Sequence, residues 1–214
     1  KNTAIGQASV KITGKGLYKG TKTVNFNIRP ATVTKLKVSS TGEKSVKLSW
    51  KKVTGADSYA IYRYDNTSKK WQRIKTVKAV SFTDSGLARA KGYSYKIKAV
   101  KKSGGKEYIS ASYSKAVEAV TKPAKASCTA KSAGSGSIEV SWKAVRGASG
   151  YEIYSSSNGS DYVKSAKVGG SQKSAIVSGF EPYSLRMVKV RAYKTVNGKT
   201  SYGAFSQAVM VIVR

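Results

Sequence analysis

The chain has 214 residues, and its 40 Lys and Arg against 10 Asp and Glu give a net charge of +30 at pH 7. It has no histidine, which excludes Ser-His-Asp and Cys-His nucleophile systems and the usual zinc triads. Its single cysteine, Cys128, excludes an internal disulfide framework. So high a charge favours binding to polyanions, such as anionic cell-wall polymers, acidic glycans, nucleic acid or anionic membrane surfaces.

The first segment, residues 1–29, carries a charge of +6 and is predicted to form a hairpin. A strand over residues 8–13 is followed by a glycine-rich connection and by a second strand that ends at Ile28. Because side chains alternate along a strand, one face of this hairpin is apolar: Val10, Ile12, Val24, Phe26 and Ile28. A lone two-stranded hairpin is marginal in water, so this face needs a partner.

The rest of the chain contains a repeat. Residues 45–64, SVKLSWKKVTGADSYAIYRY, return 92 positions later as residues 137–156, SIEVSWKAVRGASGYEIYSS. A period of about 90 residues suits a small sandwich domain and is too long for a solenoid unit. We therefore expect two copies of one domain, with charges of +15 over 30–122 and +9 over 123–214.

Within each copy, apolar residues alternate with polar ones, which is typical of half-buried strands. Gly-Gly and Asn-Gly turns separate these runs at 104–105, 158–159, 169–170 and 197–198. No stretch has a helical period, and no apolar run approaches the ~18 residues of a membrane span, so we expect no membrane insertion. Seven short strands in about 92 residues predict an all-β chain of two tandem immunoglobulin-like sandwiches, built around Trp50 and Trp142.

These residues resemble the fibronectin type III family. The resemblance lies in the Trp of the second strand, Tyr-x-Ile on the third, and a later Tyr-x-Ile-x-Ala with Tyr93 as the family's corner tyrosine. Arg186 stands at the corner position of the second copy, so the corner hydrogen bond is not assured there. The resemblance implies fibronectin type III domains over 30–122 and 123–214.

Residues 1–29 resemble the closing strands of the bacterial immunoglobulin-like repeats that precede fibronectin type III domains in secreted Gram-positive proteins. The opening strands of such a domain are missing from the sequence. This implies a truncated immunoglobulin-like domain in a fragment of a longer surface protein. The hairpin either covers the near end of the first sandwich or pairs with the hairpin of a second molecule. We favour the homodimer, since the end of one sandwich offers little area.

The sequence shows no catalytic constellation. The carboxylates are scattered, none has the spacing of a calcium loop, and no P-loop or dinucleotide motif is present. Asp57 and Asp84 could meet after folding, but both are better interpreted as solvated turn residues. Cys128 is interpreted as a small strand residue. We therefore expect no enzymatic activity, no cofactor and no metal.

Basic and aromatic residues share the outward strand faces. If Tyr59 and Ile61 point inward, Tyr62 and Tyr64 point outward, beside the outward lysines of a neighbouring strand. Cations bind the charges of a polymer, and rings stack on sugars or bases. In the first copy the candidate polyanion- or glycan-binding residues are Tyr62, Tyr64, Trp71, Lys96, Lys98, Lys101 and Lys102. The second copy is predicted to carry a thinner version of this surface, formed by Tyr154, Lys189, Arg191 and Tyr193.

The alternative is a solvated face without a ligand, because Lys and Tyr suit exposed strands and Lys discourages edge pairing. Trp71 is likewise better interpreted as the edge of the core than as a sugar platform.

The sequence predicts a non-catalytic structural and accessory module of a secreted or cell-wall-associated bacterial protein. It acts as a spacer and as an electrostatic tether to anionic wall polymers or glycans. The alternative is a ligand-specific module, either an adhesin for a host matrix protein or glycosaminoglycan, or a carbohydrate-binding appendage of a polysaccharide-degrading enzyme. Nucleic acid is a weaker candidate and is not expected as the physiological partner, because no groove-reading element is present.

Overall fold

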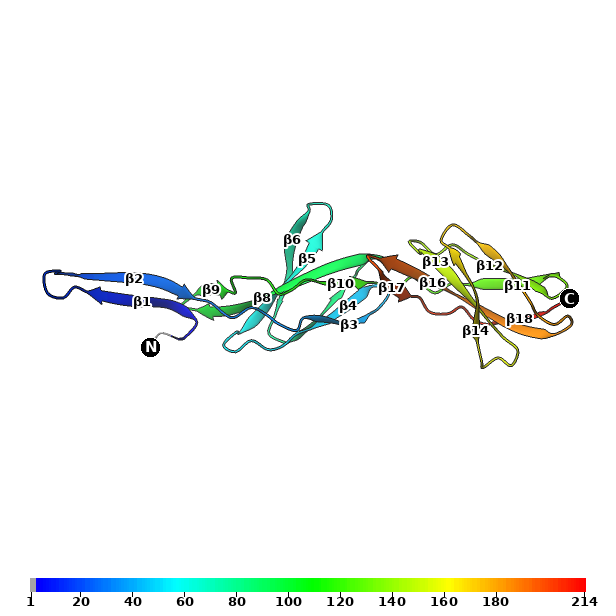
Figure 1. Cartoon of the computed structure of the whole chain (residues 1–214), viewed down its shortest axis with the longest axis horizontal. Coiled ribbons are helices and arrows are strands. Elements are labelled where there is room, and N and C mark those ends of the chain that lie inside the picture. Colours follow the sequence, from blue (N-terminus) through cyan, green and yellow to red (C-terminus); the bar gives the residue numbers. More distant parts are fainter. Residues whose placement is uncertain (1–2) are drawn as a thin grey trace. The chain divides into compact units, whose positions relative to one another are not determined.

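The computed structural model describes residues 3–214, and within them the regular secondary structure is entirely β-strand (Figure 1). The described residues form no helix long and apolar enough to cross a membrane. The chain divides into two compact units. One contains the hairpin and most of the first repeat, and the other contains the second repeat together with Thr41–Val46 and Asp84–Gly92. The domain boundaries drawn from the sequence stay predictions.

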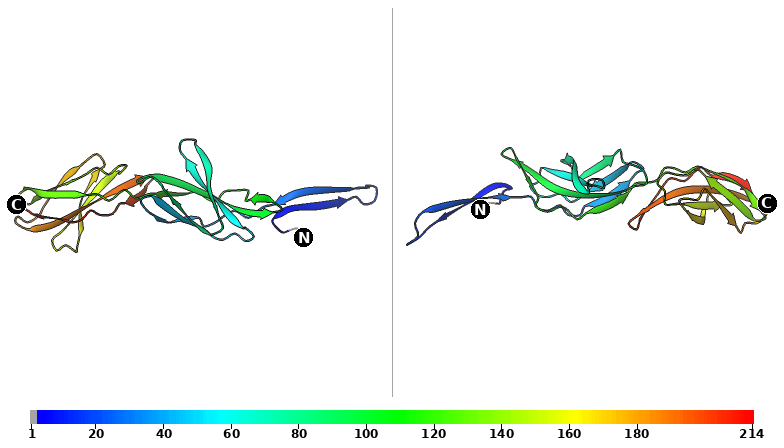
Figure 2. Two further views of the ribbon diagram at one scale, coloured as in Figure 1. Left: turned by 180° about the vertical axis from the view of Figure 1, so that it is seen from behind. Right: turned by 90° about the horizontal axis from the view of Figure 1, so that it is seen from above.

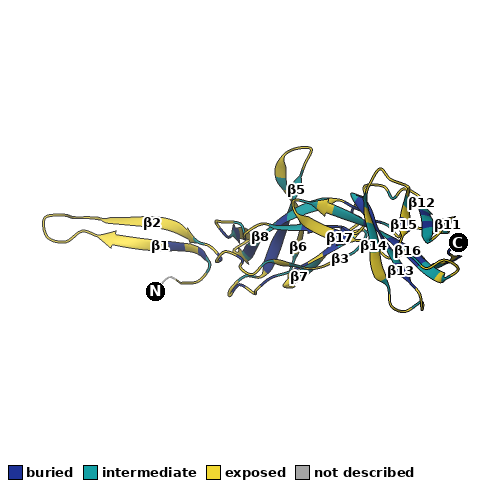
Figure 3. Cartoon of the chain, turned by 45° about the vertical axis from the view of Figure 1, so that its right-hand side comes forward, coloured by how far each residue is buried: buried dark blue, intermediate teal, exposed yellow. Residues whose placement is uncertain are grey.

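The N-terminal hairpin forms where the sequence predicts it. Strands β1 (Gly6–Thr13) and β2 (Thr21–Ile28) pair antiparallel, with Val10 opposite Val24. The apolar side chains of this face remain exposed: Val10 48%, Ile12 55%, Val24 42% and Phe26 41%. Most of the hairpin is accordingly yellow in Figure 3. The first sandwich therefore does not cover this face within the chain, and pairing with a second copy stays a prediction.

The first repeat forms two sheets. One has the order β3-β4-β7, and the other β10-β8-β5-β6, with β9 also paired to β8. Their strands are β3 (Lys37–Thr41), β4 (Ser45–Ser49), β5 (Ser58–Asp65), β6 (Lys70–Val77), β7 (Ser81–Ser85), β8 (Gly92–Ser103), β9 (Lys106–Ile109) and β10 (Val117–Val120).

The second repeat has the same strand orders. One sheet is β11-β12-β15, and the other is β14-β13-β16-β17, with β18 also paired to β16. In Figure 2 this repeat is coloured from green through yellow to red. The strands are β11 (Cys128–Gly134), β12 (Ser137–Trp142), β13 (Gly150–Ser156), β14 (Val163–Gly169), β15 (Ser174–Ser178), β16 (Leu185–Val196), β17 (Lys199–Tyr202) and β18 (Val209–Ile212). The predicted fold class, all-β with two tandem immunoglobulin-like sandwiches after a hairpin, is confirmed.

Each repeat has eight strands among the described residues instead of the predicted seven, because its last strand is broken in two. In the first repeat, β9 and β10 both pair with β8, and serines lie between them. The Ser110 hydroxyl accepts a hydrogen bond from the backbone N–H of Ala99 at 3.2 Å, and the Ser114 hydroxyl accepts one from the N–H of Ile97 at 3.0 Å. In the second repeat Ser206 accepts the N–H of Val190 at 3.0 Å. Serine side chains thus satisfy the sheet donors where the strand leaves its register.

The two tryptophans lie in the cores, as predicted, and each is 6% exposed. Trp50 packs edge-on against Tyr59 with ring centres 5.3 Å apart, and Trp142 packs against Tyr151 at 5.1 Å. An equivalent hydrogen bond holds each tyrosine. The Tyr59 hydroxyl accepts a hydrogen bond from the Val53 N–H at 2.8 Å, and the Tyr151 hydroxyl accepts one from the Val145 N–H at 2.7 Å.

The indole N–H groups differ between the repeats. Trp142 donates to the carbonyl oxygen of Gln172 at 3.1 Å. The buried Nε1 of Trp50 has no acceptor among the described residues. Because an unpaired buried donor costs free energy, this difference is testable.

Two other positions depart from expectation. Arg186, at the corner position of the second repeat, places its guanidinium 5.0 Å from the centre of the Phe180 ring, and its buried Nε has no acceptor among the described residues. Asp84 lies in β7 and is 7% exposed, so its interpretation as a solvated turn residue was wrong. Cys128 is a half-buried strand residue as predicted, with Sγ 3.2 Å from the Ser206 hydroxyl.

Candidate functional site

The register of the first repeat brings the predicted aromatic and basic residues together. Tyr62 of β5 lies opposite Lys96 of β8, and Tyr64 lies opposite Trp71 of β6. Lys98 lies opposite Ala60, one pair further along the same face. Directly opposed residues in an antiparallel pair share one face of the sheet. The predicted cluster of Tyr62, Tyr64, Trp71, Lys96 and Lys98 therefore exists as a contiguous surface.

One residue that the sequence reading overlooked, Tyr113, completes this cluster. Its ring packs edge-on against Tyr62 with centres 5.0 Å apart, as the ring of Tyr64 does against Trp71 at 5.3 Å. Edge-to-face packing of this kind is the favoured arrangement of aromatic pairs. We call the six residues Tyr62, Tyr64, Trp71, Lys96, Lys98 and Tyr113 the first cation face.

The lysines of the first cation face lie over the rings. The Lys96 ammonium is 4.5 Å from the centre of Trp71 and 5.5 Å from that of Tyr113. The Lys98 ammonium is 4.3 Å from the centre of Tyr113 and donates to the carbonyl oxygen of Ala111 at 3.0 Å. The nearest ring faces are thus occupied by the protein's own cations. Trp71 is half-buried because it packs against Tyr64 and Lys96 on the outward face of the sheet, and not because it lies at the edge of the core.

The acidic residues near this face are already paired with other cations. Arg73 forms an ion pair with Glu107 at 3.0 Å, and this hydrogen bond lowers the pKa of Glu107. Lys101 pairs with Asp57 at 2.9 Å, and hydrogen bonds from Lys101 and the Lys102 backbone lower the pKa of Asp57.

Lys101, predicted as a ligand-binding residue, is therefore engaged within the protein. Lys102 is exposed, but it lies opposite Glu107. Within residues 3–214, neither Lys96 nor Lys98 pairs with a carboxylate. The uncompensated charge of this surface thus resides on these two ammonium groups.

The second repeat carries an equivalent surface. Tyr154 of β13 lies opposite Lys189 of β16, and its ring packs edge-on against Phe205 with centres 5.0 Å apart. The Lys189 ammonium is 3.4 Å from the centre of Tyr162 and 4.5 Å from that of Phe205. Lys189, Tyr162 and Phe205 thus reproduce the contacts of Lys96 with Trp71 and Tyr113. We call Tyr154, Tyr162, Lys189, Arg191 and Phe205 the second cation face.

Arg191 has a structural role that the sequence did not reveal. It donates to the carboxylate of Glu152 at 2.8 and 3.0 Å and to the hydroxyl of Tyr154 at 2.9 Å. The Glu152 side chain is only 2% exposed, and Lys164 lies 3.6 Å from its other oxygen. Burial acts to raise the pKa of Glu152. The hydrogen bonds and the positive charge of Arg191 act in the opposite direction, with smaller contributions from Lys164 and Tyr154. Together they outweigh the effect of burial and hold this pKa below its ordinary value. The ionised carboxylate therefore holds Arg191 in place.

Tyr193 lies at the other end of the sheet, opposite Gly150. A Cβ at Gly150 would come within 2.4 Å of the Tyr193 hydroxyl oxygen, so glycine makes room for this side chain. The Lys167 ammonium lies 4.6 Å from the Tyr193 ring centre. Tyr162, Tyr202 and Phe205 thus add rings to this sheet face beyond the predicted Tyr154 and Tyr193.

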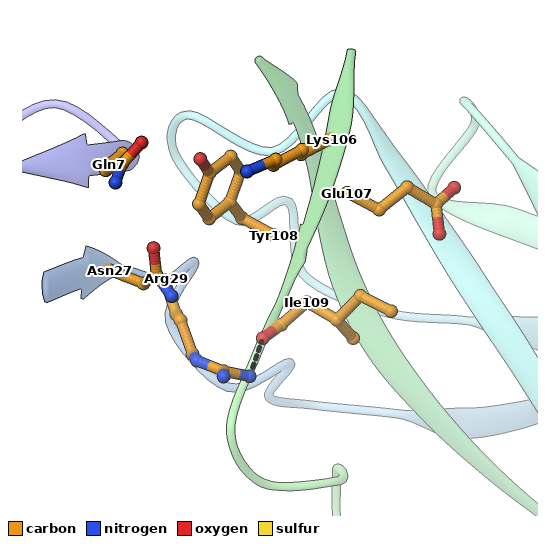
Figure 4. Close-up of a pocket in the computed structure, with 7 residues that line it drawn as sticks. All are labelled: Gln7, Asn27, Arg29, Lys106, Glu107, Tyr108 and Ile109. Carbon is orange, nitrogen blue, oxygen red and sulfur yellow. Dashed lines mark hydrogen bonds between the residues drawn. The ribbon is translucent and has the colours of Figure 1, made fainter. Parts of the chain in front are cut away.

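A pocket of about 350 Å³ separates the base of the hairpin from β9 (Figure 4). Arg29 spans it and donates to the carbonyl oxygen of Ile109 at 3.3 Å. In Figure 4, Lys106 and Tyr108 point toward Gln7, whereas the Glu107 side chain points away. Arg29 therefore attaches the hairpin to the edge of the first sandwich, and the pocket is lined otherwise by the polar residues Gln7, Asn27, Lys106, Glu107 and Tyr108.

Among residues 3–214 there is no group of three or more His, Cys, Asp and Glu side chains that could hold a metal ion.

No protein-family model matches the chain. Over 100 residues, the chain is 42% identical to a poly(3-hydroxybutyrate) depolymerase from Ralstonia pickettii, and this match covers 47% of the chain and 18% of that enzyme. In fold, it is similar to a two-domain fibronectin type III segment of chicken tenascin, with 20% identity, coverage of 87% of this chain and 99% of that one, and a TM-score of 0.49. It is also similar to the FN1–FN3 domains of chicken CNTN1, with 17% identity, coverage of 97% and 77%, and a TM-score of 0.43.

Proposed function

We propose that the chain is a non-catalytic accessory module of a secreted or surface-attached bacterial protein, and that it tethers this protein to an anionic polymer. The observation that carries the proposal is the position of Lys96 and Lys98. Both ammonium groups lie over aromatic rings, and neither pairs with a carboxylate among the described residues. Lys189 repeats the arrangement in the second repeat.

An ammonium group that is held over an aromatic ring is well placed to bind anions. An aromatic contact restricts the long side chain without using its N–H donors, of which an ammonium has three. Lys98 uses one donor on the Ala111 carbonyl oxygen. The remaining donors of both lysines can bind sulfate, phosphate or carboxylate groups of a polymer, and less conformational entropy is lost than from a free lysine.

The same geometry favours recognition by charge over recognition by stacking. A sugar ring stacks on an open aromatic face, but the rings of Trp71 and Tyr113 already carry a lysine each. A ligand therefore meets ammonium groups first. This supports an electrostatic tether rather than a sugar platform built on Trp71.

A salt series tests the tether with heparin and teichoic acid as probes. As salt rises from about 0.1 M to 1 M, the screening length falls from about 10 Å to about 3 Å, so we expect affinity for both probes to fall at least about tenfold. Binding to either probe that persists unchanged at the highest salt contradicts the tether.

The similarity to a poly(3-hydroxybutyrate) depolymerase favours a second candidate function. In this alternative the chain is an accessory region of a polymer-degrading enzyme and keeps that enzyme on its solid substrate. The match covers 18% of the depolymerase, so the relationship concerns a region of that protein and its activity is not transferred to this chain. Adsorption of the full chain to particles of poly(3-hydroxybutyrate) tests this candidate, and its failure to adsorb contradicts it.

A further inference from the structure

One sheet face of the second repeat carries an exposed apolar patch next to the second cation face. Leu185 of β16 lies directly opposite Ile212 of the edge strand β18, and Met210 is two residues before Ile212, so the three side chains share one face. Leu185 is 40% exposed, and Met210 and Ile212 are each 62% exposed. We call these residues, together with Tyr183, the β18 patch.

Tyr183 is held at the border of this patch by its backbone. Its N–H donates to the carbonyl oxygen of Val213 at 2.7 Å, immediately beyond Ile212. Its φ of 59° lies in the left-handed region, which a bulky residue rarely adopts, and its side chain is 85% exposed. Ala90, at the corresponding position of the first repeat, has a φ of 49°, so this backbone conformation belongs to the fold of both repeats, and only the large exposed side chain is particular to Tyr183.

The first repeat shows that the fold does not need an exposed apolar residue at these positions. Aligned by the shared strand pairing, Leu185 corresponds to Gly92 and Met210 to Glu118, whereas Ile212 corresponds to Val120, which is apolar but only 6% exposed. The same strand pairing forms in both repeats, with β10 on β8 and β18 on β16. The patch is therefore a property of the second repeat, and contiguous exposed apolar side chains of this kind mark interaction sites.

The unpaired charges beside the patch are cationic. A depression beside Ile212 is lined also by Lys131, Ser132 and Arg214, and Lys131 pairs with Glu139 at 3.0 Å. This leaves Arg214, and Lys189 on the same face of β16, as the cations beside the apolar side chains. Lysine and arginine side chains donate hydrogen bonds and cannot accept them. A partner that offers apolar groups together with hydrogen-bond acceptors matches these surroundings, and a polyester has this chemistry in its alkyl groups and ester carbonyl oxygens.

We propose that the β18 patch adsorbs to the surface of a solid, uncharged polyester, with its apolar side chains against the alkyl groups and the surrounding cations near the ester carbonyl oxygens. This inference rests on the second candidate function above. A second copy of the chain is disfavoured as the occupant, because each molecule carries a net charge of +30.

The test measures adsorption of the full chain to poly(3-hydroxybutyrate) particles at about 1 M salt, where the screening length is about 3 Å and charge binding is weak. The triple variant Leu185→Ser, Met210→Glu, Ile212→Thr removes the patch. Ile176→Glu is the matched control, since Ile176 is 66% exposed but belongs to the other sheet. Met210→Glu alone, which places the residue of the first repeat at this position, serves if the triple variant does not fold by circular dichroism.

We expect the wild type and the Ile176→Glu control to adsorb equally, and the patch variant to lose at least about tenfold in affinity, because removing apolar contact area weakens binding. Equal adsorption by the patch variant overturns the patch but leaves the accessory function standing. No adsorption by the wild type overturns both, and the polyanion tether is unaffected. Binding to phosphatidylglycerol vesicles without binding to the polyester, or a dimer that the patch variant abolishes, overturns the proposal in favour of a lipid surface or a second copy.

Discussion

Glu152 and Arg191 face each other across strands β13 and β16, and the guanidinium donates two hydrogen bonds to one carboxylate oxygen at 2.8 and 3.0 Å. The corresponding pair in the first repeat is Ala60 and Lys98, and Ala60 is fully buried. The same cross-strand position thus carries an internal ion pair in one repeat and a cation without a carboxylate in the other. The two cation faces share their aromatic framework but differ in which cation is available to a ligand.

The buried ion pair makes the second repeat sensitive to acid. The pKa of Glu152 in the folded protein lies below its ordinary value, so its stabilising contribution is full above the unfolded pKa and is lost as pH falls through the folded pKa. We expect the free energy of unfolding of the second repeat to fall as the pH drops below the ordinary pKa of glutamate, about 4.3. Glu152→Gln should remove this part of the pH dependence and cost about 2–4 kcal/mol near pH 7, because Arg191 loses its partner.

Denaturant unfolding measures this effect in a background in which Trp50 and Trp71 are replaced by Phe, so that the fluorescence reports on Trp142 alone. Glu139→Gln is the matched control, since the Lys131–Glu139 pair is exposed and should contribute about 0–1 kcal/mol. A Glu152→Gln variant with the pH dependence of the wild type contradicts the assignment of acid sensitivity to this pair.

The two core tryptophans should respond differently to the same substitution. Trp→Phe at either position removes similar ring volume, but only Trp142→Phe leaves a carbonyl oxygen, that of Gln172, without its donor. Trp50→Phe removes a buried N–H that has no acceptor among the described residues. We expect Trp142→Phe to destabilise its repeat by about 1 kcal/mol more than Trp50→Phe does. Scanning calorimetry of the two full-length variants measures the difference, and equal or reversed losses would show that the indole hydrogen bond has no net effect.

The hairpin should contribute little to the stability of the sandwiches. Val10 and Phe26 are 48% and 41% exposed, so we expect Val10→Thr with Phe26→Thr to leave the unfolding of both sandwiches within about 0.5 kcal/mol of wild type. Leu48→Ala is the contrasting variant, because Leu48 is fully buried and its truncation should cost about 2–5 kcal/mol. A large loss in the hairpin variant would mean that its apolar face packs on a sandwich in solution.

The fold could be predicted from the sequence because alternation and repetition are local signals. Val46 and Leu48 alternate with polar neighbours, and their counterparts Ile138 and Val140 recur at a fixed offset. The break in the last strand was not predictable in this way. It depends on the Ser110 and Ser114 hydroxyls taking the place of backbone carbonyls, and in the sequence these serines resemble ordinary loop residues.

The candidate site could be predicted only in outline. Strand alternation placed Tyr62 beside Lys96, but it could not show that Lys101 reaches Asp57 or that Arg191 reaches Glu152, because these pairs depend on side-chain contacts between strands far apart in the sequence. Tyr113 and Phe205 could have been found, since both are aromatic and stand 92 positions apart.

The proposed tether requires that the first cation face, and not net charge alone, binds polyanions. Two double variants separate these explanations, because each lowers the net charge from +30 to +26. Lys96→Glu with Lys98→Glu changes the face itself. Lys37→Glu with Lys47→Glu changes exposed lysines on the other sheet of the same repeat.

The most direct measurement is the affinity of these two variants and the wild type for heparin at one salt concentration, about 0.1 M, where the screening length is about 10 Å. We predict that the Lys96/Lys98 variant loses at least about tenfold more affinity than the Lys37/Lys47 variant, because only the former removes the ammonium groups held over Trp71 and Tyr113. Equal losses in the two variants would contradict a specific face and would leave a uniformly charged, solvated surface.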